Sequence, residues 1–189
     1  MNIMKKLLIL PFITLPLIAF GFNMAQFQQC QKLLKKCPMN GPFLNATCVN
    51  QTVNMTKPCI QLSKVSKATS VQANYIDAQA FGNLTLLTLH YPADGRQLYS
   101  VITADHAIVS LNVNPQQMDY ALVKKYKNKL IFTTILGKPS YKKLSSGLQQ
   151  FSVMARMTEK CVSCAVVGKI NVDFNFNAQG KYLGVLVKH

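Results

Sequence analysis

A cysteine-rich stretch, residues 27–59, constrains the fold of this chain more than any other feature. It contains four of the six cysteines, which are Cys30, Cys37, Cys48 and Cys59. Residues 1–21 before it have the pattern of a secretory signal peptide, because Lys5 and Lys6 precede an uncharged apolar run that ends in small residues. The alternative is an uncleaved N-terminal anchor. Cysteines of an exported chain enter an oxidising compartment, so we expect all six to form disulfides.

The spacing of apolar residues predicts a helix that carries the first two of these cysteines. Phe27, Cys30, Leu34 and Cys37 recur at steps of three and four, and Pro38 ends the pattern. The segment that follows is rich in asparagine, threonine and valine, which are weaker helix formers. We predict a second helix there, antiparallel to the first.

Two antiparallel helices favour a nested pairing of Cys37 with Cys48 and of Cys30 with Cys59. The cysteines are seven residues apart on the first segment and eleven apart on the second, so their spacings along the helix axes differ. The nested pairing therefore requires the chain to bend near Pro58, which disfavours helical geometry at the residue before it. Six cysteines allow many pairings, and the sequence leaves the choice among them open.

The chain after residue 66 has the alternating pattern of β-strands around one internal helix. A turn signal at 92–95 joins two strands into a hairpin. The predicted helix is capped by Asn114, with Pro115 at its first position and Tyr126 on its apolar face. The predicted strands are residues 84–91, 98–103, 107–112, 130–136, 151–157, 169–176 and 183–187.

The predicted fold class is α+β, with an N-terminal disulfide-linked helical element followed by a mostly antiparallel sheet of six or seven strands with one internal helix. We divide the chain into a signal peptide (1–21), a cysteine-rich helical element (22–66) and an α+β domain (67–189). The remaining segments are expected as a short extended piece at 60–65, a linker at 66–70, a strand or helix at 72–80 and a loop at 137–147.

The charge of the chain is strongly positive. It contains 21 lysine and arginine residues against 6 aspartate and glutamate residues, and removal of Lys5 and Lys6 with the signal leaves 19 against 6, or +13. Only Arg96 and Arg156 are arginines, and arginine is the better reader of phosphate, so specific nucleic-acid binding is not expected. A lysine-rich surface suits an anionic surface or a protein partner, and it also provides solubility.

The best candidate for an anion-binding surface combines a helix end with a basic loop. Its residues are Lys124, Lys125, Lys138, Tyr141, Lys142 and Lys143. The helix dipole alone favours lysines at a helix C-terminus, so the two helix lysines have an explanation without a ligand. The prediction therefore depends mainly on the three lysines of the loop.

Two pairs of residues offer chemistry. His90 and His106 lie near predicted strand ends, and with a lysine they would form the acid–base pair of a ribonuclease-like hydrolase. Cys161 and Cys164 have the spacing of a thiol–disulfide site. The plainer alternatives are surface histidines and a structural loop, because a strand rather than a helix follows Cys164. The cysteine spacing does not match a zinc site and no cofactor motif occurs, so we expect neither a metal nor a cofactor.

We therefore predict an exported, non-enzymatic binding or envelope-associated protein that engages an anionic or protein partner, in the periplasm or outside the cell. The two alternatives are a hydrolase that uses His90 and His106 and a thiol–disulfide protein that uses Cys161 and Cys164. The short signal and the bias toward lysine and asparagine are typical of bacteria. No segment after the signal has the length of a membrane span, so we expect none.

Overall fold

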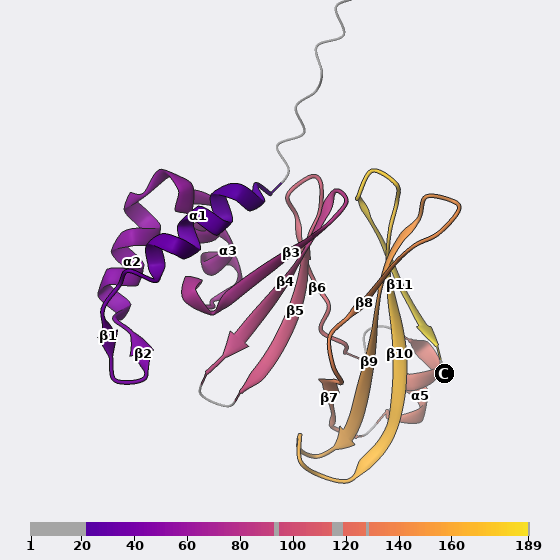
Figure 1. Ribbon diagram of the computed structural model, residues 1–189. Coiled ribbons are helices and arrows are strands. Elements are labelled where there is room, and N and C mark those ends of the chain that lie inside the picture. Colours follow the sequence, from indigo (N-terminus) through magenta and orange to yellow (C-terminus); the bar gives the residue numbers. More distant parts are fainter. Residues whose placement is uncertain (1–21, 93–94, 115–118, 128, 189) are drawn as a thin grey trace, which may run out of the picture.

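The structure is a computed structural model in which residues 22–92, 95–114, 119–127 and 129–188 are described. The predicted signal peptide, residues 1–21, lies outside the described residues. The described chain forms three layers, which are a helical layer, a first β-sheet and a second β-sheet in that order (Figure 1). This arrangement confirms the predicted α+β class.

Three helices tied by two disulfides make up the helical layer. Asn23 and Asn45 cap the first two helices, since their side chains accept hydrogen bonds from the main-chain N–H groups of Gln26 and Cys48. None of the helices in the described residues is long and apolar enough to cross a membrane. The elements of this layer are α1 (Met24–Leu34), β1 (Met39–Asn40), β2 (Phe43–Leu44), α2 (Ala46–Met55), the 3₁₀ turn η1 (Lys57–Cys59), α3 (Ile60–Thr69) and the 3₁₀ turn η2 (Ala73–Tyr75).

The nested disulfide pairing is confirmed. Cys30 is bonded to Cys59, and Cys37 is bonded to Cys48. The expected bend near Pro58 is the turn η1, which follows α2 and brings the buried Cys59 back to the buried Cys30 of α1. The two crosslinks therefore hold α1 against both α2 and η1.

Residues 60–70 differ from the prediction, which was wrong in placing an extended piece and a linker there. They contain α3, because Leu62 and Val65 are buried on one helix face against the other helices and the first sheet. The Thr69 hydroxyl donates a hydrogen bond to the Val65 carbonyl at 2.8 Å. The helix continues through the predicted domain boundary, and the division of the chain into two domains stays a prediction.

The first sheet is an antiparallel meander in the order β3, β4, β5 and β6. Both of its faces are buried, which explains the nearly continuous apolar sequence of β4. Leu84 and Leu86 belong to the core shared with the second sheet, whereas Leu87 and Leu89 belong to the core shared with the helical layer. The strands are β3 (Ile76–Phe81), β4 (Leu84–Tyr91), β5 (Arg96–Ile102) and β6 (Ile108–Ser110).

The second sheet is antiparallel, in the order β11, β10, β9 and β7, and β8 pairs with the other end of β9. The prediction of a loop over 137–147 missed β8, which pairs because the Tyr141 ring packs on Phe81 and Phe151 at centroid distances of 4.8 and 5.2 Å. The predicted strands thus divide between two facing sheets. The strands are β7 (Ile131–Ile135), β8 (Ser140–Lys143), β9 (Gln149–Glu159), β10 (Val166–Phe176) and β11 (Tyr182–Lys188).

The internal helix α5 (Tyr120–Lys125) begins at a different cap from the predicted one. Asp119 is extended, and its side chain accepts a hydrogen bond from the N–H of Leu122 at 3.0 Å. Asp119, directly before α5, therefore caps this helix, whereas the cap predicted at Asn114 precedes residues that are not described and stays a prediction. The predicted positions at 115–118 lie outside the described residues. Leu122 and Tyr126 are buried in the core shared by the two sheets.

A buried glutamine joins the two sheets at one end. Gln149 of β9 is 3 % exposed, and its amide donates hydrogen bonds to Asn83 Oδ1 at 2.8 Å and to the Asn177 carbonyl at 3.0 Å. Its side-chain oxygen accepts a hydrogen bond from the Tyr141 hydroxyl at 3.0 Å. Asn83 follows β3 and Asn177 follows β10, so one side chain links both sheets. Gly180 approaches so closely here that a Cβ atom would lie 3.0 Å from Asn83.

The two disulfides of the helical layer should differ in their contribution to stability. Cys30 and Cys59 are separated by 29 residues and Cys37 and Cys48 by 11. Loop entropy then gives the longer link about 3.6 kcal/mol and the shorter one about 2.8 kcal/mol. Urea unfolding of the two double alanine variants measures this. A larger loss for the variant without the shorter link would contradict the entropic account.

Replacing Gln149 by leucine should lower the free energy of unfolding by about 2 to 3 kcal/mol, because the hydrogen bonds of this buried side chain to Tyr141, Asn83 and Asn177 are lost together. The matched control is Gln150→Leu on the same strand, where one hydrogen bond to Asn175 is lost at a half-buried site. We expect a loss of about 1 kcal/mol or less for the control. Urea unfolding of both variants gives the comparison, and equal losses would show that Gln149 does not join the sheets.

Candidate functional site

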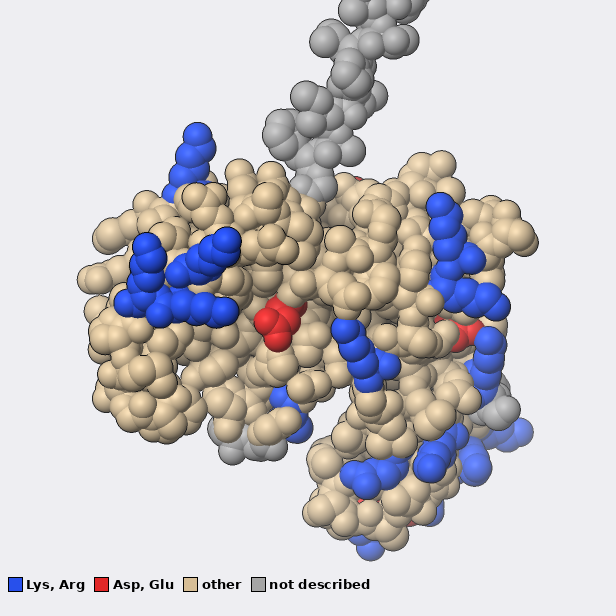
Figure 2. All heavy atoms as spheres, viewed as in Figure 1, with Lys and Arg blue, Asp and Glu red and all other residues tan. Residues whose placement is uncertain are grey.

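The two sheets diverge at the end away from Gln149 and leave a cleft between them (Figure 2). The larger part of this intersheet cleft has a volume of about 740 Å³ and lies between the start of β5 and the strand β7. A smaller part of about 380 Å³ lies against β3 and β4. Gln97, Tyr99 and Gly137 line both parts, so the two parts form one site.

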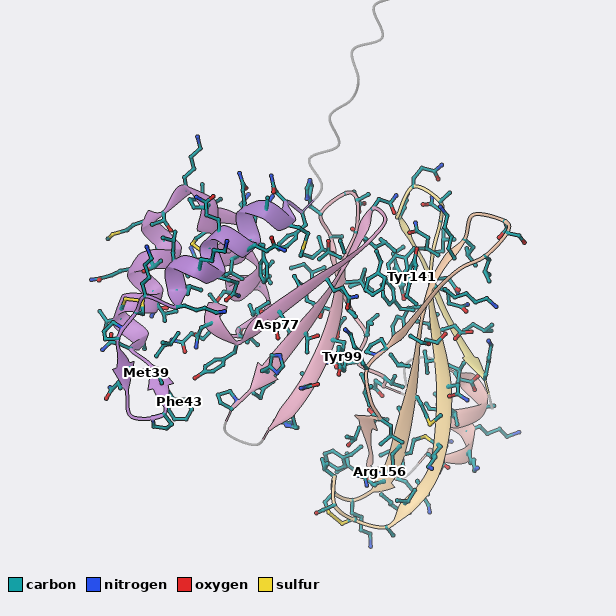
Figure 3. All side chains as sticks on the ribbon, viewed as in Figure 1. Met39, Phe43, Asp77, Tyr99, Tyr141 and Arg156 are labelled. Atoms are coloured by element: carbon teal, nitrogen blue, oxygen red, sulfur yellow. A yellow bond between two sulfur atoms is a disulfide. The ribbon has the colours of Figure 1, made fainter. Side chains whose placement is uncertain are left out.

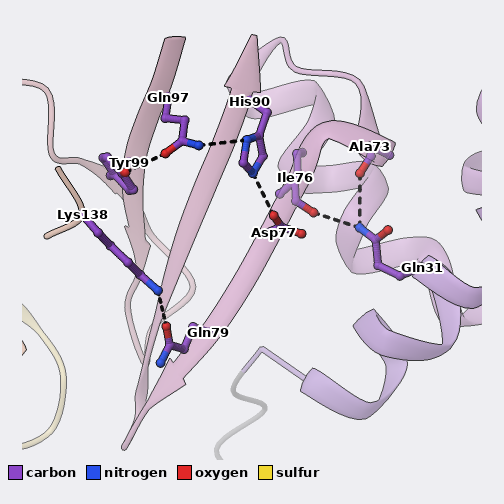
Figure 4. Close-up of polar contacts among 9 residues, drawn as sticks. All are labelled: Gln31, Ala73, Ile76, Asp77, Gln79, His90, Gln97, Tyr99 and Lys138. Carbon is purple, nitrogen blue, oxygen red and sulfur yellow. Dashed lines mark hydrogen bonds and ion pairs between the residues drawn. The ribbon is translucent and has the colours of Figure 1, made fainter. Parts of the chain in front are cut away.

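A chain of hydrogen-bonded side chains covers the wall that the first sheet contributes (Figures 3 and 4). The Tyr99 hydroxyl donates to Gln97 Oε1 at 2.9 Å, and the Gln97 amide lies 3.4 Å from His90 Nδ1. His90 Nε2 lies 2.8 Å from Asp77 Oδ2. Strand pairing produces this chain, because His90 is opposite Gln97 and alternate residues of β3, β4 and β5 share one face.

The hydrogen-bond partners of His90 fit one neutral tautomer of its imidazole ring. When the Gln97 amide donates to Nδ1, the proton of a neutral imidazole is on Nε2 and is donated to Asp77. Burial raises the pKa of the Tyr99 phenol, so Tyr99 remains a neutral donor. Both ring nitrogens of His90 are therefore engaged by protein groups.

Lys138 bridges the two sheets across the smaller part of the cleft (Figure 4). It lies in the connection between β7 and β8, and its ammonium group donates a hydrogen bond to Gln79 Oε1 of β3 at 2.6 Å. Gln79 lies on the same face of β3 as Asp77, since two residues separate equivalent positions of a strand. One lysine of the predicted anion-binding loop thus forms part of the cleft.

The opposite wall of the cleft is more apolar and is made by β7. Ile131 and Ile135 are half-buried and pack against the core shared by the sheets. Between them, the Thr133 hydroxyl donates a hydrogen bond to the Val113 carbonyl, which ties the segment after β6 to β7. Asn112 and Asn114 line the cleft beside this tie. The cleft therefore has one wall rich in amide and hydroxyl groups and one aliphatic wall.

The predicted pair of catalytic histidines is not assembled. His90 lines the cleft, whereas His106 lies in the turn between β5 and β6 and lines a separate pocket next to Phe22 and Lys64. The turn that contains His106 follows Ile102 of β5, which pairs with Thr85 of β4. Thr85 and His90 are five residues apart on β4, so the two ends of the strand are separated by about 17 Å. The two imidazoles cannot act on one bond because they lie at opposite ends of the first sheet.

The predicted anion-binding residues do not form a single patch. Lys142 and Lys143 extend β8, which pairs with β9 near Gln149, whereas Lys124 and Lys125 belong to α5. The helix packs at the other end of β9, where Tyr126 and Gly168 meet. Tyr141 is half-buried in an aromatic cluster. Figure 2 shows basic side chains distributed over the helical layer and the second sheet.

Cys161 and Cys164 are bonded to each other at the tip of the β9–β10 hairpin. Cys164 is exposed and Cys161 is half-buried, and the Cys161 sulfur lies 3.5 Å from the Ser163 hydroxyl oxygen. Val162, between the two cysteines, lines the larger part of the cleft. All six cysteines therefore form disulfides, and the third one borders the site.

No known protein family, characterised protein or solved structure shows a significant match to this chain. Its site must therefore be interpreted from geometry. The sequence singled out His90 and Lys138 of this site but missed Gln97 and Tyr99. The sequence did contain a signal for a polar site on this wall. The positions of β4 that face the second sheet change from leucine at 84 and 86 to threonine at 88 and histidine at 90. The register with β5, which sequence alone does not provide, completes the site.

The exposed Cys161–Cys164 disulfide should be reduced before the buried Cys30–Cys59 disulfide. Thiol–disulfide exchange requires that a thiolate reach the sulfur, and Cys164 is exposed whereas Cys30 and Cys59 are buried. With limiting reductant, alkylation and peptide mass analysis should show Cys161 and Cys164 labelled at least tenfold faster than Cys30 and Cys59. Equal labelling of the two pairs would show that accessibility does not control reduction here.

Proposed function

We propose that this chain is an exported, non-enzymatic binding protein that holds part of a protein partner in the intersheet cleft. The observation that carries the proposal is the cleft itself, whose larger part of about 740 Å³ lies within the range typical of ligand sites. It combines convergent polar groups with an aliphatic wall, the composition expected of a recognition site. The buried disulfide between Cys30 and Cys59 supports export to an oxidising compartment, such as the periplasm or the surroundings of the cell.

The state of His90 favours binding over hydrolysis. A general base needs a free nitrogen within reach of a substrate, and both nitrogens of His90 face Asp77 or Gln97. His106, the predicted second catalytic residue, lies at the other end of the first sheet. The polar wall therefore supports recognition by hydrogen bonds rather than proton transfer.

The charges of the cleft favour a protein partner over an anionic surface. Asp77 has a side chain that is 75 % exposed, and it shares the smaller part of the cleft with Lys138. A site for an anionic surface would be expected to carry one sign of charge, whereas amides such as Gln97 and Asn112 hydrogen-bond equally well with main-chain groups. A peptide segment matches this mixed lining.

The exposed Cys161–Cys164 disulfide favours a second candidate function, thiol–disulfide exchange. A thiolate of another protein would attack the exposed Cys164 sulfur, and the bond to Cys161 would break. Cys161 would leave as a thiolate that accepts a hydrogen bond from Ser163. The loop has no helix N-terminus to stabilise this thiolate, so peptide binding remains the leading proposal.

The binding proposal is tested with peptides selected by phage display against the oxidised chain, residues 22–189. The variant Gln97→Trp fills the position shared by both parts of the cleft, and Gln97 is exposed, so the fold tolerates the change. We expect at least tenfold weaker peptide binding, about 1.4 kcal/mol, by calorimetry.

The matched control is Leu186→Trp, which introduces the same side chain at a residue that is 52 % exposed on β11. This variant should bind the selected peptides like the unchanged protein. Selected peptides that bind the Gln97→Trp variant with full affinity would refute the cleft as the binding site.

A further inference from the structure

Among the described residues, no strand lies beside one edge of β7. β7 pairs with β9 on one side, and the hydrogen bonds just beyond its ends define the orientation of its main chain. The Leu136 N–H donates to the Met154 carbonyl at 2.7 Å, and the Lys160 N–H donates to the Leu130 carbonyl at 2.9 Å. At the alternate positions between Leu130 and Leu136, the residues Phe132 and Thr134 therefore direct their N–H and C=O groups toward β9 as well.

The intervening residues direct their main-chain groups the opposite way. Ile131, Thr133 and Ile135 alternate with the residues bonded to β9, so their N–H and C=O groups point to the other edge. No hydrogen bond from the described part of the chain reaches these groups. The continuous run Leu130–Ile135 lines the cleft, as expected where a strand presents its edge rather than one face. Three pairs of main-chain N–H and C=O groups, spaced two residues apart, thus face the cleft.

The facing wall also contains an unpaired edge. β6 pairs with β5 at Ser100–Ile102, and the last bond of this ladder runs from the Leu111 N–H to the Tyr99 carbonyl at 2.9 Å. Gln97 precedes Tyr99 by two residues, so its N–H and C=O point to the same edge. In the described residues no main-chain group pairs with Gln97 on this edge, because the chain turns toward β7 at Val113. The cleft lies between two strand edges that lack neighbours.

We propose, on the basis of the function proposed above, that the bound segment of the partner is an extended peptide that pairs with β7 as an added strand of the second sheet. Main-chain groups of a peptide supply the missing hydrogen bonds, a recurrent mode of peptide recognition. The five residues of β7 match a peptide core of about 17 Å. Alternate side chains of the peptide pack on Ile131 and Ile135, and the intervening ones face solvent.

The lining of the cleft defines the chemistry of this peptide. Ile131, Thr133 and Ile135 are β-branched, a residue type that packs well on the pleated surface of a sheet, so β-branched side chains of a peptide fit beside them. Arg96 and Lys138 border the cleft, and the chain after the signal has a net charge of +13, from 19 basic and 6 acidic residues. The peptide is therefore apolar at alternate positions and acidic at its ends.

The position of β7 favours a single peptide over a second copy of this chain. An exposed edge without charged or proline residues would normally promote pairing between copies. Here the edge opens into a cleft whose other wall is the first sheet, so a single extended chain enters more easily than a whole sheet. Two copies also carry the same large positive charge, which opposes their association.

The test is amide hydrogen exchange by nuclear magnetic resonance on the oxidised chain, residues 22–189. The probe is an acetylated and amidated octapeptide of alternating valine and threonine with a glutamate at each end. Without peptide, Phe132 and Thr134 should exchange more slowly than Ile131, Thr133 and Ile135, because only the first two amides bond to β9. At nine-tenths occupancy, the three exposed amides should slow about tenfold, since exchange then occurs only from the unbound tenth.

N-methylated probe peptides are the matched control, because they leave the protein unchanged. Methylation at every second residue removes one set of peptide N–H groups, so one of the two methylation patterns should abolish binding and the other should not. If the octapeptide binds and Gln97→Trp weakens it while the three amides keep their rates, strand addition is refuted and the proposed function stands. If the octapeptide does not bind at all, strand addition is refuted regardless of the peptides found by phage display. Protection of the three amides that appears without peptide and disappears on dilution would show self-pairing and refute a peptide occupant.

Discussion

The hydrogen bonds of Gln149 determine how the two sheets meet. This one buried side chain bonds to Asn83 after β3 and to Asn177 after β10, so the first and second sheets are held at one end. Between the sheets the buried residues are aliphatic and aromatic, and they pack the sheets together. Twisted sheets that are joined at one end separate toward the other, and the intersheet cleft occupies the space that results.

The disulfides of the helical layer serve the same architecture from the other side. They hold α1 against α2 and η1, and the helices bury Leu87 and Leu89 of β4. The first sheet is thereby packed on both faces and provides a firm wall. The hydrogen-bond chain from Tyr99 to Asp77 depends on that wall, because its members come from three different strands held in register. The disulfides of the helical layer thus help to position the hydrogen-bonded side chains of the cleft without contacting them.

β7 is one of several edge strands, and its free edge borders the intersheet cleft. Unpaired strand edges promote aggregation, and proteins normally shield them with charges, prolines or short strands. β7 instead contains Ile131, Thr133 and Ile135, and its shield is its position within the cleft. Retaining such an edge is consistent with a role in binding, since a partner strand satisfies the same groups that would otherwise be exposed to water.

The sequence by itself determined two disulfide-linked helices and the α+β class, because helix periodicity and strand alternation are local patterns. It favoured the nested cysteine pairing but left the choice among pairings open, and the tertiary structure decided it. The sequence predicted an extended piece at 60–65 and a linker at 66–70 because Leu62 and Val65 show too short a helical pattern, and burial against the first sheet decided in favour of α3. The tertiary structure alone decided that the strands form two sheets, that His90 and His106 lie apart, and that Gln97 and Tyr99 join His90. The physical reason is that strand register and sheet packing depend on contacts between residues distant in the chain, and alternation within one strand contains no information about which strand lies beside it.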